Sequence, residues 1–337
     1  MLMDLEPPAI VRTDAAEFSV LTYNVRGLPW PVATGRGAAL QAIGQELADL
    51  RREGRQPDVV LIQEGFRSEM AELVRTSGYA YWAEGPGRET RAPHGPAPAR
   101  RDAKILLGEG VGKLTGAGLH VLSDAPILDV QVATFRHCAG LDCLANKGAM
   151  LVRIQPPGLP TPVDVVNTHL NSRKASRAPS GRTLAAHQGQ TLELLAFLAT
   201  HRDPDHPLIV GGDFNIRNSP ARYDFAAEQR PYRVVAEYCA RVEPVCGATP
   251  GPVRDDGRPW LATQILQGFA DGDVRVRPRA TAALFDTGAA RLSDHDGYLV
   301  SYRLSWPAAF DPDRRERAAL EIKPRIGKWG VKISWRP

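Results

Sequence analysis

Long hydrophobic runs are missing from this chain of 337 residues. No stretch of about 18 apolar residues occurs, so we expect no membrane-spanning helix. No segment recurs at a fixed period, which excludes solenoid and propeller folds. An excess of one charge sign is also absent: the formal net charge of +4 permits contact with phosphate or lipid surfaces but does not require it.

Cysteine is sparse, with four residues in two local pairs, Cys138/Cys143 and Cys239/Cys246. Neither pair has the two-residue spacing of a zinc knuckle or a histidine at ligand spacing, so we expect disulfides, with free thiols as the alternative. Disulfides would indicate an oxidising compartment and an exported protein, periplasmic or secreted. The segment from Met1 to Glu17 lacks the apolar core of a secretory signal, so a native start at Met1 would indicate a cytoplasmic protein.

The residues that are abundant suit a globular protein with many turns. Hydrophobic residues make up 43% and charged residues 24%, with 31 Gly and 28 Pro, which is enough for an ample core. The length alone fits one large domain or two ordinary ones. Apolar strands alternate with helical patterns and also form hairpins, so we expect mixed sheets.

Polar side chains gather at the ends of the apolar strands. The strand expected over 207–210 runs into two glycines and then into Asp213 and Asn215, which project the same way. Other such strands cover 18–23, 58–62, 163–168 and 298–304. The polar residues at these ends are Asn24, Glu64, His169, Asn171, Asp213, Asn215, Asp294 and His295. They form one site only if residues 24 to 295 belong to one domain, so we expect a single domain.

Each of these residues also has an ordinary structural interpretation. Glu64 fits a position beside a helix cap, His169 a buried imidazole and Asp294 a turn. Eight together indicate one site. One strong carboxylate with carboxamides suits Mg²⁺, with Mn²⁺ as the alternative, rather than zinc, and two histidines can transfer protons.

In sequence order these residues resemble the motifs of the endonuclease/exonuclease/phosphatase superfamily of metal-dependent phosphoesterases. The five motifs are Leu21-Thr22-Tyr23-Asn24-Val25, Leu61-Ile62-Gln63-Glu64, Asn167-Thr168-His169-Leu170-Asn171, Gly212-Asp213-Phe214-Asn215 and Ser293-Asp294-His295. The resemblance implies an α+β fold, a four-layer sandwich of two mixed sheets flanked by helices. It also implies a catalytic domain over 18–306, between an N-terminal extension at 1–17 and a C-terminal extension at 307–337.

The resemblance assigns roles to these residues. Glu64 is implied as the principal metal carboxylate, with Asn24 and Asp294 completing the metal shell. Asp213 and Asn215 are implied to position the attacking water and the phosphate. His295 is the better candidate for the general base and His169 for a hydrogen bond to the phosphate or the leaving oxygen, although the two histidines could exchange roles. The family often orients the final histidine with an aspartate in the penultimate strand, where this chain has Thr263 and Gln264.

Lys147, within Asn146-Lys147-Gly148, has two interpretations that the sequence leaves open: a contact with phosphate, or a hairpin turn. The stretch 143–148, together with 168–172, is most similar to bacterial neutral sphingomyelinases, which implies Lys147 and Asn171 as substrate-binding residues. The implied reaction is phospholipase C-type hydrolysis of a phosphodiester in a lipid headgroup, with peripheral membrane contact.

A nuclease or phosphatase of the same superfamily, with nucleic acid as the partner of the former, is the alternative enzyme, and a non-catalytic binding scaffold is the alternative of another class. Trp30 and Trp260 are candidates for an apolar rim at the site, although burial is the commoner fate of a tryptophan. No aromatic-tipped hairpin of the kind carried by secreted sphingomyelinases is evident.

Overall fold

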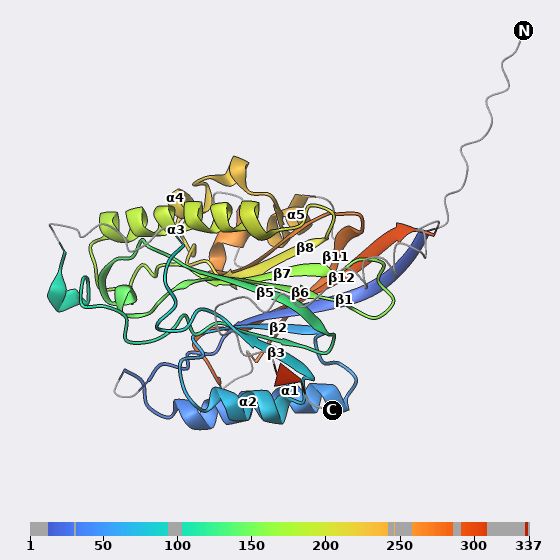
Figure 1. The fold of residues 1–337 in the computed structure, drawn as a ribbon, viewed down its shortest axis with the longest axis horizontal. Coiled ribbons are helices and arrows are strands. Elements are labelled where there is room, and N and C mark those ends of the chain that lie inside the picture. Colours follow the sequence, from blue (N-terminus) through green and yellow to red (C-terminus); the bar gives the residue numbers. More distant parts are fainter. Residues whose placement is uncertain are drawn as a thin grey trace, which may run out of the picture.

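The computed structural model describes residues 13–29, 32–93, 103–241, 246, 258–285, 291–308 and 334–335. Two mixed β-sheets lie face to face, with helices on both outer faces (Figure 1). This is the four-layer α+β sandwich expected from the sequence.

The first sheet has seven strands in the order β11-β12-β1-β2-β4-β3-β13. Their bounds are β1 (Thr13–Asn24), β2 (Val59–Gln63), β3 (Tyr81–Glu84), β4 (His120–Ser123), β11 (Arg275–Leu284), β12 (Gly297–Pro307) and β13 (Ser334–Trp335). Strands β1 and β2 run parallel, and Asn24 pairs with Gln63, so both strands end at the same edge of the sheet.

The second sheet has six strands in the order β5-β6-β7-β8-β10-β9. Their bounds are β5 (Ile127–Thr134), β6 (Gly148–Ile154), β7 (Val163–His169), β8 (Leu208–Asp213), β9 (Arg233–Val234) and β10 (Ile265–Ala270). Its central pair, β7 and β8, is also parallel, and His169 pairs with Asp213 at the end of the register.

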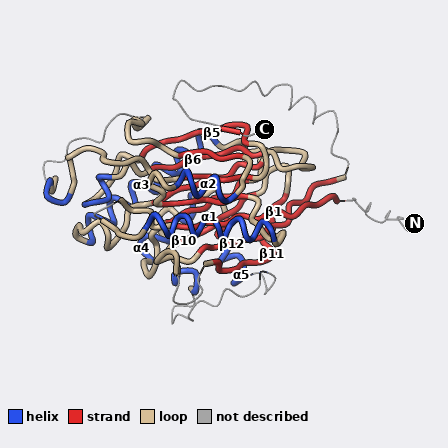
Figure 2. Tube along the Cα trace, turned by 90° about the horizontal axis from the view of Figure 1, so that it is seen from below, coloured by secondary structure: helices blue, strands red, loops and turns tan. Residues whose placement is uncertain are grey.

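Helices cover the outer face of each sheet (Figure 1). The helices α1 (Arg36–Arg52) and α2 (Met70–Ser77) lie over the first sheet, as Figure 2 shows from their side. On the second sheet lie α3 (Ser180–His201), α4 (Pro220–Tyr223) and α5 (Val235–Arg241). Leu40, Ile43 and Leu47 form the buried stripe of α1, as the 3.6-residue period predicts. No helix in the described ranges is long and apolar enough to cross a bilayer.

Strand alternation separates the core into layers. Leu61 of β2 faces the cluster between the sheets, together with Val165 and Ile209 of the second sheet, whereas the next residue, Ile62, packs with α1 and α2. The same alternation turns the last residues of β1, β7 and β8 inward. The space between the sheets therefore changes from apolar to polar at this end of the molecule.

The structure departs from the expected boundaries in a few places. The region 261–269, proposed as a strand, begins as a 3₁₀ helix at Pro259–Ala262, and β10 starts only at Ile265. Strand β1 begins at Thr13 and pairs with β12 from there, so pairing starts ahead of the boundary predicted at residue 18. Most of the C-terminal extension lies outside the described residues, and the domain limits stay predictions.

Candidate active site

Four polar side chains meet where the two parallel strand pairs end. Asn24 ends β1, Glu64 follows β2, His169 ends β7 and Asp213 ends β8. Beneath them the Gln63 carboxamide donates to Asn167 Oδ1 at 2.8 Å, and the Asn167 amide donates to the Ile62 carbonyl at 2.9 Å. These buried bonds cross from one sheet to the other and fix the relative positions of the strand ends.

Asn24 lies between the two carboxylates of the site. Its Nδ2 is 3.0 Å from Glu64 Oε1 and 3.0 Å from Asp213 Oδ2, and its Oδ1 accepts from the Arg26 N–H. Glu64 has a positive φ of 59°, a conformation that costs free energy for a residue with a side chain. The backbone after β2 is thus held in an unfavourable turn that directs a carboxylate at the end of β1.

Burial raises the pKa of both carboxyl groups, since little water solvates the charge, and the charge of Asp213 raises the pKa of Glu64 further. Hydrogen bonds from Asn24 act in the opposite direction but do not cancel this effect. Two buried carboxylates on one amide form a pocket of negative charge that a cation would relieve.

The donors present fit a hard cation. The carboxylates of Glu64 and Asp213 offer only oxygen as ligand atoms, which suits Mg²⁺ or Mn²⁺, whereas Asn24 presents its amide nitrogen to both and its Oδ1 accepts from the Arg26 N–H. Among the described residues, no group of three His, Cys, Asp or Glu side chains is preformed with metal-ligand geometry. The Asn24 and Glu64 assignments agree with this arrangement, in which a carboxamide takes part, but they stay predictions.

His169 is buried between the carboxylates and Lys147. Its Nε2 lies 3.8 Å from Asp213 Oδ2, 4.0 Å from Glu64 Oε1 and 3.2 Å from Lys147 Nζ. Burial and, after it, the positive charges of Lys147 and His295 hold the pKa of His169 well below its usual value. His169 is therefore a neutral imidazole near pH 7.

Lys147 reaches into the site instead of only closing a hairpin. The ammonium contacts Asp142 Oδ2 at 2.9 Å and the Leu170 carbonyl at 3.0 Å, besides His169. Asp142 lies in the 3₁₀ helix η2 (Gly140–Leu144), and the loop it belongs to is closed by the disulfide Cys138–Cys143. The expected pairing of all four cysteines as disulfides is confirmed.

His295 approaches Asp213 from the segment before β12. Its Nε2 lies 3.9 Å from Asp213 Oδ2 and 3.0 Å from the Gln264 carboxamide nitrogen. Gln264 thus occupies the place beside the imidazole where the resemblance implies an aspartate. An amide can orient the ring but brings no charge to stabilise an imidazolium.

Asn215 and Asp294 lie at the two sides of this cluster. The Asn215 amide donates to the Leu170 carbonyl at 3.0 Å, and its φ of 51° is again positive. The Asp294 side chain is 53% exposed and lies 3.6 Å from Arg26. Asp294 is therefore at the solvent edge, next to His295, and is farther out than the metal position inferred around Glu64 and Asn24.

Asn171, predicted as a substrate-binding residue, contacts backbone groups of neighbouring loops. Its Oδ1 accepts from the Ala139 N–H at 2.9 Å, its Nδ2 donates to the Ser172 carbonyl at 2.8 Å, and the residue is fully buried. Both polar ends of the amide contact backbone, so Asn171 holds the loop after β7 in place, and its role in substrate binding stays a prediction.

Three supporting residues were missed by the sequence analysis. Gln190 of α3 accepts from the Asn171 N–H at 2.6 Å, and His187 contacts the Phe214 carbonyl at 2.8 Å. Arg222 of α4 donates to the carbonyls of Asn171 and Asn215. His187 and Gln190 are three residues apart and so lie on one face of α3, and this spacing could have indicated polar side chains that point toward the site. Arg222 gave no such signal.

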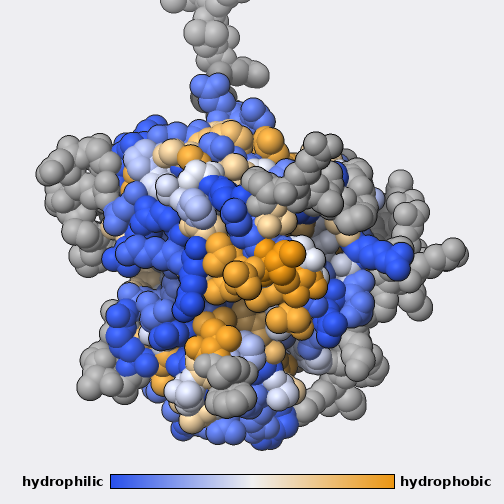
Figure 3. All heavy atoms as spheres, turned by 90° about the vertical axis from the view of Figure 1, so that its left-hand side faces the viewer, coloured by the Kyte–Doolittle hydropathy of each residue, from blue (hydrophilic) through white to orange (hydrophobic). Residues whose placement is uncertain are grey.

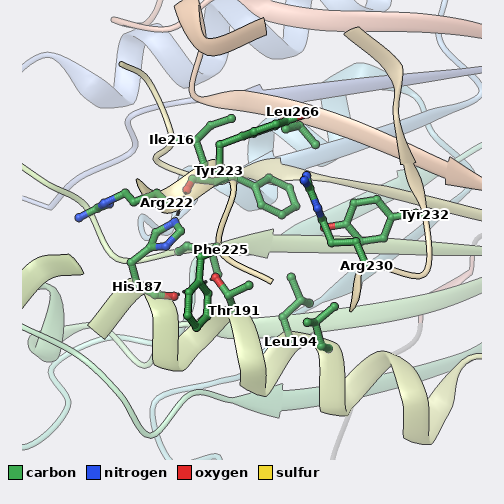
Figure 4. Close-up of a pocket in the computed structure, with 13 residues that line it drawn as sticks. His187, Thr191, Leu194, Ile216, Arg222, Tyr223, Phe225, Arg230, Tyr232 and Leu266 are labelled. Atoms are coloured by element: carbon green, nitrogen blue, oxygen red, sulfur yellow. Dashed lines mark hydrogen bonds between the residues drawn. The ribbon is translucent and has the colours of Figure 1, made fainter. Parts of the chain in front are cut away.

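The tryptophan rim is not supported for Trp260, which is buried against Tyr223 and Arg241. Trp30 lies outside the described residues. A cavity of about 20 Å³ lies behind the site, where α3 faces the segment around Tyr223 and Tyr232 (Figure 4). Its lining is largely apolar and contains neither carboxylate of the site, so the cavity is separate from the candidate site.

The geometry agrees with the comparison to protein families. A model of the Endonuclease/Exonuclease/phosphatase family matches residues 21–295. The chain belongs to this family. The match spans all five motifs, from the strand that ends at Asn24 to His295.

Solved structures of related fold include bacterial sphingomyelinases. Sphingomyelinase C from Streptomyces griseocarneus has a TM-score of 0.55 at 22% identity, covering 85% of this chain and 99% of that chain. Beta toxin from Staphylococcus aureus, with bound magnesium ions, has a TM-score of 0.57 at 18% identity over 85% and 99% of the two chains. D. rerio TDP2 complexed with a single-strand DNA product has a TM-score of 0.54 at 14% identity over 85% and 99%. At these identities the likeness shows the fold.

Two curated proteins of similar sequence are also named as sphingomyelinases. A Sphingomyelinase of Mycobacterium bovis is 27% identical over 210 residues, which are 61% of this chain and 36% of that protein. Sphingomyelinase C of Listeria ivanovii is 31% identical over 111 residues, or 33% of this chain and 32% of that protein. The matched part of the chain thus spans about a third of the length of these curated relatives.

Proposed function

We propose that the chain is a divalent-metal-dependent phosphodiesterase of the sphingomyelinase, phospholipase C type, which hydrolyses the headgroup phosphodiester of a lipid. The observation that carries the proposal is the buried Lys147–His169 contact beside Glu64 and Asp213. It puts a cation, a neutral imidazole and two carboxylates within one small volume. Sphingomyelinase relatives at modest identity support the lipid branch.

The chain's own residues account for the steps that follow substrate binding. Bound Mg²⁺ would be held by Glu64 with Asn24 and would supply Lewis-acid charge to a phosphoryl oxygen. Asp213 and Asn215 orient the attacking water, and His295 accepts its proton as the new P–O bond forms. The bond to the lipid oxygen breaks, and that oxygen takes a proton from the Lys147–His169 pair. Asp294 stays at the entrance, where its charge acts on His295.

Lys147 has a defined electrostatic task in this scheme. Its ammonium is buried, and among the residues that the structure describes it contacts one carboxylate, that of Asp142, in addition to a carbonyl and an imidazole. A phosphodiester anion entering beside His169 would add a second negative partner. Charge complementarity of this kind strengthens with exclusion of water, so Lys147 contributes most when the substrate fills the site.

A nuclease of the same family is the second candidate. The structural likeness to TDP2 with a DNA product supports it, and exposed Lys174 and Arg177 stand in the loop after β7. A backbone-tracking nuclease needs a longer basic path, and the lysine–histidine contact is explained equally well by a single phosphodiester. We therefore place the lipid reaction first.

The test is turnover of purified protein with Mg²⁺ and with EDTA on three substrates in parallel: sphingomyelin vesicles, supercoiled plasmid and bis-p-nitrophenyl phosphate. Phosphocholine release that EDTA abolishes is the expected result. Nicking of the plasmid without hydrolysis of the vesicles would show that the protein is a nuclease and not a lipid phosphodiesterase. Absence of metal-dependent turnover on all three would contradict the proposed phosphodiesterase.

We also propose that the protein works in an oxidising compartment, after export. The two disulfides support this, because such bonds persist mainly outside the reducing cytoplasm. Thiol labelling of the protein taken directly from its native cells tests it. Unlabelled cysteines are expected, and four reactive thiols would contradict export.

A further inference from the structure

Four exposed aliphatic side chains lie within ten residues of one another. Leu106 is 98% exposed, Ile105 69%, Leu114 58% and Val111 54%. Among the described residues only two other large hydrophobic side chains, Val32 and Leu192, are comparably exposed. Water-exposed aliphatic residues scattered singly need no explanation, but a cluster of this kind marks an interaction surface.

This 105–114 segment is fixed to the body of the protein. Buried Glu109 accepts from the Lys104 N–H at 2.9 Å and from the Gly140 N–H at 2.9 Å, and it pairs with Arg182 of α3. The 3₁₀ helix η1 (Ile105–Leu107) therefore projects from a hydrogen-bonded base. Its apolar side chains are presented to solvent by an ordered anchor, which is a costly arrangement unless something covers them.

The anchor leads directly to the proposed active site. The Leu114 N–H donates to the Leu144 carbonyl at 2.7 Å, and the Asn146 N–H donates to the Thr115 carbonyl at 3.0 Å. Lys147 is the next residue. The same η2 stretch carries Asp142, the carboxylate partner of Lys147. The exposed segment and the phosphate-side cation of the site therefore share one rigid support.

The segment lies at the end of the molecule where the site opens. In Figure 1, β1 runs from the N-terminal side on the right toward its carboxyl end on the left, where the teal 3₁₀ turn of residues 105–107 projects. Figure 3 looks at this end and shows an apolar patch bordered by hydrophilic side chains.

Exposed cations stand beside the apolar cluster. Lys104 directly precedes the cluster, and Lys174 and Arg177 lie in the loop after β7. This loop is hydrogen-bonded to η2, because the Leu141 N–H donates to the Ser176 carbonyl. Aliphatic side chains that enter the acyl boundary, with lysine and arginine at headgroup level, are the pattern of an interfacial membrane contact. Protein-binding surfaces are instead enriched in aromatic side chains, which this cluster lacks.

We propose that the 105–114 segment is a membrane-docking element that inserts Ile105 and Leu106 into the surface of a phospholipid bilayer and presents lipid headgroups to the adjoining site. The presentation of substrate rests on the proposed function. The docking itself does not, because it depends only on the apolar cluster and its cationic border.

The test compares wild type with an Ile105→Asp/Leu106→Asp double variant and with Leu192→Asp. Leu192 is an exposed leucine of α3 outside the segment, so it controls for the chemistry of the substitution. Binding is measured by flotation with vesicles of phosphatidylcholine, sphingomyelin and phosphatidylglycerol. Turnover of bis-p-nitrophenyl phosphate, which has no bilayer, is measured in parallel.

We expect the double variant to lose about tenfold or more of its vesicle binding, since two inserted aliphatic side chains become charged. Leu192→Asp should bind as wild type does, and both variants should keep wild-type turnover of the soluble ester. Lipid-vesicle hydrolysis should fall with binding.

Equal vesicle binding by wild type and double variant would overturn the proposal. So would a wild-type dimer that binds no vesicles and that the double variant converts to monomers, because the cluster would then be a contact between copies of the chain. If binding depends on Ile105 and Leu106 but no phosphodiester is hydrolysed, docking stands and the proposed function fails.

Discussion

The ammonium nitrogen of Lys147 lies 3.2 Å from Nε2 of His169 in a buried position. An ammonium can only donate, so this ring nitrogen accepts and the imidazole carries its proton on Nδ1. The pair gives the site one positive charge that is held by its contacts with Asp142 and the Leu170 carbonyl. The tautomer of His169 is thus a consequence of Lys147.

Replacing Lys147 by Met tests this relationship. We expect kcat/KM to fall about 100-fold or more, because a charge aimed at the phosphate is lost. Burial and Lys147 both lower the pKa of His169, so the pKa should rise in the variant. Nitrogen-15 chemical shifts of the imidazole against pH measure both the tautomer and the pKa. Unchanged kinetics with unchanged shifts would reduce Lys147 to a structural residue at the start of β6.

Replacing Glu64 by Gln should separate function from stability. Burial raises the pKa of Glu64, so its folded-state value lies above the unfolded one, and the folded state loses stability as pH rises and the buried carboxyl ionises. In EDTA at neutral pH the variant should therefore unfold at a higher temperature than wild type. Added Mg²⁺ should raise the wild-type Tm and leave that of the variant unchanged. A Mg²⁺ shift of equal size in both proteins would remove Glu64 from the metal site.

His187 makes the fold sensitive to acid. Burial and then Arg222 lower its pKa to about 3, while the bond to the Phe214 carbonyl acts against them. The unfolded chain takes up this proton near pH 6.5, so the stabilisation is complete above that pH and is lost as pH falls toward 3. The effect is on the order of several kcal/mol.

His187→Gln keeps an amide donor for Phe214 but does not titrate. Its free energy of unfolding, from urea melts, should change less than that of wild type between pH 6.5 and pH 4. His137→Gln, at an exposed imidazole, controls for the loss of one histidine. Parallel pH profiles for wild type and His187→Gln would contradict a buried neutral imidazole.

Arg222 is a positioning residue for two loops of the site. It is buried, and its Nη1 joins the Asn171 carbonyl at 2.7 Å to the Asn215 carbonyl at 3.1 Å. Arg222→Met should lower kcat about tenfold or more while KM changes little, because the water-positioning loop moves. Lys in the same place should restore part of the rate. Equal losses in both variants, with an equal fall in Tm, would indicate a packing role alone.

Sequence reasoning located the strand ends because strand alternation is local. Asn24, His169 and Asp213 each end a strand, and alternate residues of these strands face the same side of the sheet. Because the paired strands are parallel, their carboxyl ends meet at one edge of the sheet. The same pattern predicted mixed sheets, and the resemblance of the five motifs to the superfamily implied the four-layer sandwich. Gln264 beside His295 was also visible as a departure from the family.

The supporting residues could not be found this way. Arg222 acts through two backbone carbonyls, and Asn171 uses its whole side chain on backbone of neighbouring loops. Such bonds depend on how loops from distant parts of the chain pack against one another. The spacing of residues in the sequence does not predict these contacts. Trp260 is buried for the same reason, since Tyr223 covers it from another element.

The most direct measurement uses phosphorus-31 NMR to follow the hydrolysis of sphingomyelin vesicles by wild-type protein and by the Glu64→Gln variant in Mg²⁺. We expect a phosphocholine signal with wild type, and a rate lower by about 10³-fold, equivalent to about 4 kcal/mol of transition-state stabilisation, with the variant. Circular dichroism confirms that both are folded. Equal phosphocholine release by the two proteins would contradict catalysis at this cluster.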